Sequence, residues 1–131
     1  AQMSGITTEQ RIDIWAGSQP IGLAFQRLFQ ILKEDNAKNM LFIRYEDLTA
    51  HPAREVEKIY NFFQLPSYDH DFDNVLQLTQ EDDSVYGIFG DHKIRSKVEP
   101  TPKDYKQVLG TQACNWIRQN YDWFYQQFKY N

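Results

Sequence analysis

The stretch that decides the fold of this chain is Met40-Leu41-Phe42-Ile43-Arg44-Tyr45-Glu46-Asp47-Leu48. Its apolar residues lie between turn signals and predict a buried core strand near residues 40–45. Ligands of open α/β sheets bind at the carboxyl ends of the strands, so the polar residues that follow form a candidate site, in which Tyr45 offers a ring and a hydroxyl. The commoner alternative is structural, with Arg44 and Glu46 paired and Asp47 capping the following turn.

Helical patterns fill most of the remaining chain. Pro52 suits the first position of a helix that the Leu65-Pro66 pair ends. The exposed face of this helix is predicted to hold Arg54, Glu55, Glu57 and Lys58. Further helices are predicted from about Ser18 to Glu34, briefly from about Asp69, from a Thr101 cap to Leu109, and over residues 111–129. The chain is therefore expected to be mostly α-helical, with an N-terminal segment over residues 1–17 and one strand whose partners the chain does not visibly supply.

The composition is that of one folded domain. Of the 131 residues, 41% are hydrophobic and 15% aromatic, which is enough to fill a core and argues against disorder. The formal net charge of −4 disfavours nucleic-acid binding but leaves room for a small basic pocket. A single cysteine, Cys114, excludes an internal disulfide and favours a reducing, cytoplasmic location. We expect neither a signal peptide nor a membrane span, because no apolar run has the required length.

Residues 80–102 lose the helical period and are interrupted by glycines and prolines. A loop of this length in a compact domain is either functional or disordered, and its apolar centre favours a functional loop that folds over a ligand. The loop carries Lys93, Arg95 and Lys97, and such cations suit a phosphate-bearing ligand. A solvated run of charges is the commoner origin of such a pattern.

The segment Asp69-His70-Asp71-Phe72-Asp73 begins like a calcium-binding loop. However, Asn74 and Gln80 stand where such a loop requires glycine and glutamate, so an acidic helix N-terminus is the better interpretation. His70 has no second histidine or cysteine at zinc spacing, and no metal site is predicted. No nucleophile, base and phosphate-loop motif combine into a self-sufficient catalytic set, so no catalytic residue is assigned.

Several of these pieces together resemble the sulfotransferase family that uses 3′-phosphoadenosine-5′-phosphosulfate (PAPS). They are Phe42-Ile43-Arg44-Tyr45-Glu46-Asp47-Leu48, then His51-Pro52, then Ile59-Tyr60-Asn61-Phe62-Phe63-Gln64-Leu65-Pro66. The Gly90–Arg95 segment and the aromatic final helix are also similar to bacterial members. The resemblance covers roughly Trp15 to the C-terminus. It implies a P-loop-like α/β sulfotransferase fold, of which this chain would be the C-terminal half, a single partial domain over residues 1–131.

The resemblance also implies roles for particular residues. Tyr45 aligns with the tyrosine that contacts the adenine end of PAPS, and Thr79 lies where a second adenine-contacting stretch begins. Lys93, Arg95 and Lys97 lie in the loop over residues 80–102 that closes over the 3′-phosphate. Many members have Arg-Lys-Gly where this chain has Arg95-Ser96-Lys97. The resemblance therefore does not single out one residue of this loop as the contact with the 3′-phosphate.

The function that the resemblance implies is transfer of a sulfonyl group from PAPS to a hydroxyl or amine of a small molecule or glycan, without a metal. The family's 5′-phosphosulfate loop and catalytic base have no counterpart in this sequence, so the chain alone is expected to be inactive. The unpartnered strand and the apolar helix faces predict self-association. The alternative is a stand-alone, mostly helical binding or interaction module that uses the aromatic final helix.

Overall fold

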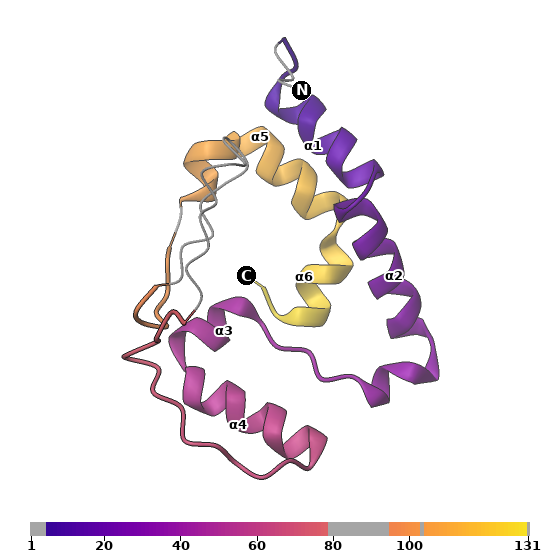
Figure 1. Cartoon of the computed structure of the whole chain (residues 1–131). Coiled ribbons are helices and arrows are strands. Elements are labelled where there is room, and N and C mark those ends of the chain that lie inside the picture. The colour runs from indigo at the N-terminus through magenta and orange to yellow at the C-terminus, as the bar shows by residue number, and fades with distance from the viewer. Residues whose placement is uncertain (1–4, 79–94, 103, 131) are drawn as a thin grey trace. The chain divides into compact units, whose positions relative to one another are not determined.

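The computed structural model describes residues 5–78, 95–102 and 104–130 (Figure 1). The chain divides into two compact units. We call residues 1–40 together with 102–131 the terminal unit, and residues 41–101 the central unit. Thr79 and Lys93, two of the predicted cofactor-binding residues, lie outside the described residues, as does most of the predicted loop over 80–102.

The terminal unit is helical and contains α1 (Thr8–Gly17), α2 (Ile21–Lys33), the 3-10 helix η1 (Asp35–Asn39), α5 (Tyr105–Asn120) and α6 (Asp122–Phe128). The sequence did not predict α1. It begins with a capping box, in which the Thr7 hydroxyl accepts a hydrogen bond from the Gln10 backbone N–H and the Gln10 side chain accepts one from Thr7. The helix predicted from about Ser18 to Glu34 is α2, but it begins later, at Ile21. Ser18 is instead the C-cap of α1, where its hydroxyl donates to the Ile14 carbonyl.

A half-buried aromatic cluster joins α2 to the C-terminal helices within the terminal unit. The ring of Phe25 on α2 lies 4.7 Å from that of Tyr121, 5.0 Å from Phe124 and 6.1 Å from Trp123, measured between centroids. The edge-to-face geometry of the last two pairs is the favourable one for aromatic rings. Ala113 on α5 is 1% exposed. The aromatic residues of the final segment are therefore packing residues, as their spacing indicated.

Two breaks divide the C-terminal helical segment. Gly110 has φ 78° and ψ 161°, which confirms the predicted interruption there. The helix cap before it is Asp104, whose carboxylate accepts from the Gln107 backbone N–H, and not Thr101 as predicted. The predicted helix over 111–129 is also broken, because Tyr121 leaves helical geometry and α6 begins at Asp122.

The central unit contains α3 (Tyr45–Ala50) and α4 (Pro52–Phe63), which pack against each other. The predicted core strand near 40–45 was wrong, because the described residues contain no strand and Tyr45 begins a helix. The backbone before α3 is extended, with φ −124° and ψ 137° at Met40 and φ −78° and ψ 136° at Arg44. Extended backbone becomes a strand only by ladder hydrogen bonds to a neighbour, and the described segments provide none.

The limits of α4 follow its sequence signals closely. Pro52 occupies the first turn, and Gln64 ends the helix in the left-handed conformation at φ 54°. One residue of the predicted exposed face is in fact buried, since Glu55 is only 2% exposed. Its carboxylate accepts hydrogen bonds from Lys58 Nζ at 2.7 Å and from Arg54 Nε at 2.8 Å. Glu55 can be buried because both of these cations pair with it.

The short helix predicted from about Asp69 was also wrong. The Asp71 carboxylate accepts hydrogen bonds from the backbone N–H groups of Asp73 and Asn74, which makes a turn instead. His70 lies among aromatic rings, and its Nε2 is 2.8 Å from the Tyr60 hydroxyl. In the part of the chain that the structure covers, no helix has both the length and the apolar character that crossing a bilayer requires.

Candidate nucleotide-binding site

Tyr45 is the first residue of α3 and presents its side chain to solvent. The residue is 60% exposed. Its backbone is fixed by the Thr49 hydroxyl, which donates to the Tyr45 carbonyl at 3.0 Å. Its own hydroxyl lies 3.4 Å from Thr101 Oγ1, across 56 positions of sequence. The site therefore has an exposed aromatic ring on a residue whose backbone carbonyl and side-chain hydroxyl both make hydrogen bonds.

Thr101 comes from the end of the predicted closing loop. The sequence suggested only a capping role for it, so its contact with Tyr45 was missed. No local sequence pattern predicts a hydrogen bond between positions so far apart in the chain. The contact brings the C-terminal end of the loop over residues 80–102 to Tyr45.

The described end of this loop is also attached at a second place. The Val98 backbone N–H donates to the Phe72 carbonyl at 2.8 Å, and the Val75 N–H donates to the Ser96 carbonyl at 2.7 Å. These two bonds hold residues 96–98 beside residues 72–75. The backbone that carries Arg95 and Lys97 thus has a fixed neighbour.

The two described cations of the loop have different surroundings. Lys97 Nζ lies 2.6 Å from Asp73 Oδ1, and this hydrogen-bonded ion pair raises the pKa of the Lys97 amine above its usual value. Arg95 is exposed and forms no ion pair with any other residue in the described part of the chain. Asp73 was considered in the sequence only as one of a row of acids, so its pairing with Lys97 was missed.

Ahead of α3, the Arg44 guanidinium lies 3.5 Å from Asp47 Oδ2, one helical turn away. Asp47 and Glu46 both belong to the first turn of α3, where a negative charge interacts favourably with the helix dipole. The structural interpretation had paired Arg44 with Glu46 and had assigned Asp47 to capping, whereas the structure pairs Arg44 with Asp47. Tyr45 offers an exposed ring beside this ion pair.

Metal ligation has no visible basis in the described residues, because they contain no group of three or more His, Cys, Asp or Glu side chains placed to hold an ion. His70 and its acidic neighbours, the nearest approach to such a group in sequence, are occupied otherwise. His70 bonds to Tyr60 and stacks on Phe72, while Asp71 closes a turn.

The chain matches the family model described as Sulfotransferase domain over residues 2–107. The chain belongs to the sulfotransferase family. The matched residues include Tyr45, Arg95 and Lys97, and they end before α6 and most of α5. No curated protein and no solved structure matches the chain. Family membership implies a P-loop-like fold, although the residues that the structure describes are helical and carry no strand.

Proposed function

We propose that this sulfotransferase-family chain contributes the nucleotide-binding side of a PAPS-dependent enzyme that sulfonates a hydroxyl or amine of a small molecule or glycan. The observation that carries the proposal is the family match, because it spans the whole of the Tyr45 site and the described end of the closing loop. In the proposed reaction the S–O bond of the phosphosulfate breaks and a new S–O or S–N bond forms at the acceptor, which loses a proton. The other product is 3′-phosphoadenosine-5′-phosphate.

Tyr45 is proposed to bind the adenine. Its exposed ring offers a face for stacking, an interaction worth about 1–3 kcal/mol per base where alanine substitution has been measured. The contact of its hydroxyl with Thr101 supports this role, because a restrained ring loses less entropy on binding than a free one. Thr79 is proposed to provide a second contact with the adenine.

Arg95 is proposed to hold the 3′-phosphate. Its guanidinium can donate two parallel hydrogen bonds to a phosphate, and it is not engaged by an acid within the described chain. Lys97 is a weaker candidate for direct contact, since Asp73 already neutralises it. We assign Lys97 to positioning the loop, and Lys93 remains proposed as a further phosphate contact.

The chain alone is proposed to be inactive. Its sequence contains no glycine-rich phosphate loop with the lysine that stabilises the transferring group, and none of its residues is assigned as the base. This agrees with its proposed place as the C-terminal part of a sulfotransferase domain of bacterial type. We also propose that the segment 40–44, which is extended at Met40 and Arg44, and exposed apolar side chains such as Phe63, which is 61% exposed, cause self-association.

Calorimetry with 3′-phosphoadenosine-5′-phosphate tests the site. We expect Arg95→Ala to weaken binding about 10- to 150-fold, the effect of losing a hydrogen bond to a charged group. Arg27→Ala is the matched control, because Arg27 is likewise an exposed arginine, and it lies on α2 of the terminal unit. Tyr105→Ala is the control for Tyr45→Ala, because Tyr105 is a 52% exposed tyrosine. Equal losses in variant and control would contradict the assignment.

Two further measurements address the rest of the proposal. Turnover of radiolabelled PAPS by the isolated chain would refute its proposed inactivity. A strictly monomeric species in light scattering would refute self-association. A chain that binds no nucleotide would instead support the alternative, a helical binding or interaction module.

A further inference from the structure

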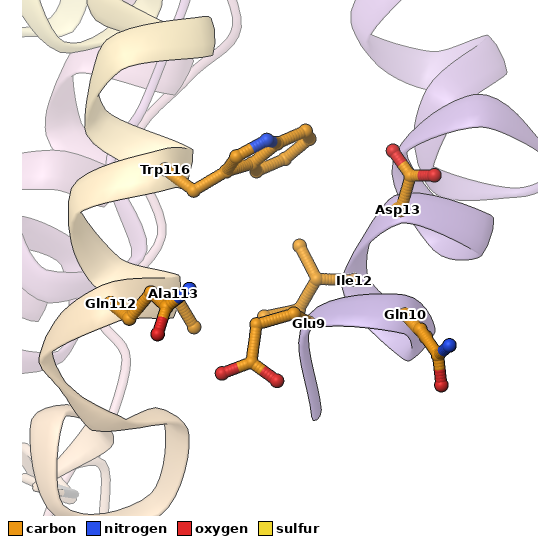
Figure 2. A pocket seen from close by; sticks show the side chains of 7 residues that line it. All are labelled: Glu9, Gln10, Ile12, Asp13, Gln112, Ala113 and Trp116. Carbon is orange, nitrogen blue, oxygen red and sulfur yellow. The ribbon is translucent and has the colours of Figure 1, made fainter. Parts of the chain in front are cut away.

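A pocket of about 380 Å³ lies between α1 and α5, within the terminal unit. Its described lining is Glu9, Gln10, Ile12, Asp13, Gln112, Ala113 and Trp116 (Figure 2). The volume is in the range that small-molecule sites occupy, roughly 300–1,000 Å³. None of these residues belongs to the nucleotide-binding side proposed above.

The walls of the pocket differ in chemistry. Figure 2 shows Glu9 and Asp13 on α1 and the indole of Trp116 reaching from α5 toward α1. Glu9 and Asp13 are one helical turn apart and so lie on one face of α1. Among the residues that the structure describes, the lining holds two carboxylates and no Lys, Arg or His. Neither carboxylate forms an ion pair with a residue that the structure describes.

The aromatic wall is held in place by its neighbours. The ring of Trp116 meets that of Tyr121 edge to face, with centroids 6.3 Å apart. The Tyr121 hydroxyl donates to the carbonyl of Ala16, on α1, at 3.4 Å. Tyr121 thereby links the helix that carries the carboxylates to the helix that carries the indole. Ala113, which is 1% exposed, is small enough to leave the space between them open.

We propose that this pocket binds an organic cation, an ammonium group with an apolar body. An indole face attracts a cation through its quadrupole, and tryptophan is the best of the aromatic residues for this purpose. The two carboxylates complement the positive charge, while Ile12 offers apolar contact to the substituents. Binding would also relieve the repulsion between like charges one turn apart on α1.

The test is calorimetry of the whole chain with choline as the probe. We expect a dissociation constant on the order of 1 mM, and at least about tenfold weaker binding of the neutral isostere in which a tert-butyl group replaces trimethylammonium. The double variant E9Q/D13N should weaken choline binding about tenfold, and Trp116→Leu about 2- to 30-fold. Equal binding of choline and its neutral isostere, or no binding of choline, overturns the proposal.

Matched controls separate the pocket from general effects of charge and fold. Glu57→Gln removes an exposed acid on α4, and Trp15→Leu removes a 50% exposed indole that does not line the pocket. Both should leave choline affinity unchanged. E9Q/D13N alters only exposed side chains, so it tests the pocket even where Trp116→Leu fails to fold. Unchanged affinity in E9Q/D13N overturns the proposal. Flotation with phosphatidylcholine vesicles then distinguishes a lipid headgroup from a free ammonium compound as the source of the cation.

Discussion

Three glycines of the terminal unit allow steric strain and backbone strain to be measured separately. A Cβ built at Gly22 would collide with the carbonyl oxygen of Ala16 and lie 2.9 Å from the carbonyl carbon of Ala16. A Cβ at Gly110 or Gly17 would meet nothing within 4 Å. Gly110, however, has φ 78° and ψ 161°, a region that residues with a Cβ rarely adopt, whereas the φ of Gly17 is not positive.

The expected magnitudes follow from these three environments. Gly22→Ala should lower the free energy of unfolding by about 1–3 kcal/mol, because the colliding atoms are backbone atoms that no rotamer change can move. Gly110→Ala should lower it by about 1–3 kcal/mol through backbone strain alone. Gly17→Ala should raise it by about 0.4–1 kcal/mol, because alanine restricts the unfolded chain and is compatible with the end of α1.

Urea unfolding followed by tryptophan fluorescence is a suitable assay. All three tryptophans, Trp15, Trp116 and Trp123, belong to the terminal unit, so the signal reports that unit. The reasoning would be refuted by a Gly22→Ala variant as stable as the parent, since α1 and α2 would then not approach as described. A Gly110→Ala variant that matched Gly17→Ala would show that α5 is not interrupted at Gly110.

The remaining predictions concern the aromatic cluster and two ion pairs. Phe25→Leu keeps most of the apolar area but loses the ring contacts, so it should cost about 1–2 kcal/mol in the same urea assay; no change would contradict the aromatic cluster. The hydrogen bond from Lys58 lowers the pKa of Glu55 below its usual value of 4.5. The stability that ionised Glu55 contributes is therefore present above pH 4.5 and is lost as pH falls through the lowered pKa. Glu55→Gln should therefore flatten the acid side of a stability–pH curve, and an unchanged slope would count against the pairing. The hydrogen bond to Asp73 raises the pKa of Lys97 above its usual value of 10.5. The stability that this ion pair contributes is therefore present below pH 10.5 and is lost as pH rises through the raised pKa. Lys97→Met should flatten the alkaline side, as followed by circular dichroism, whereas a parent-like slope would argue against the ion pair.

Local signals in the sequence predicted the elements whose causes are local. The sequence correctly placed the start of α4 at Pro52, its end before the Leu65-Pro66 pair, and the break at Gly110. Each of these depends on the backbone preferences of one or two residues. The Asp69 helix failed for an equally local reason. The Asp71 side chain competes with helix formation by bonding to backbone N–H groups two and three residues ahead.

The strand near residues 40–45 failed for a different reason. The backbone is extended at both ends of this segment, at Met40 and at Arg44. A strand also needs a partner, however, and a one-dimensional pattern does not reveal whether a partner is present. Glu55 shows the same limit for a side chain. Its position among charged residues predicted exposure, and its burial depends on Arg54 and Lys58 turning back toward it.

By itself, the sequence determined the family and most of the helices, because motif spacing, proline and glycine positions and apolar periodicity act over a few residues. Only the tertiary structure decided which residues of the candidate site meet. The contact of Tyr45 with Thr101 and the pairing of Lys97 with Asp73 join segments distant in the chain, and so does the pocket between Trp116 and the carboxylates of α1. Such contacts form when helices and turns pack together, and that packing depends on the burial of the whole chain rather than on any local pattern.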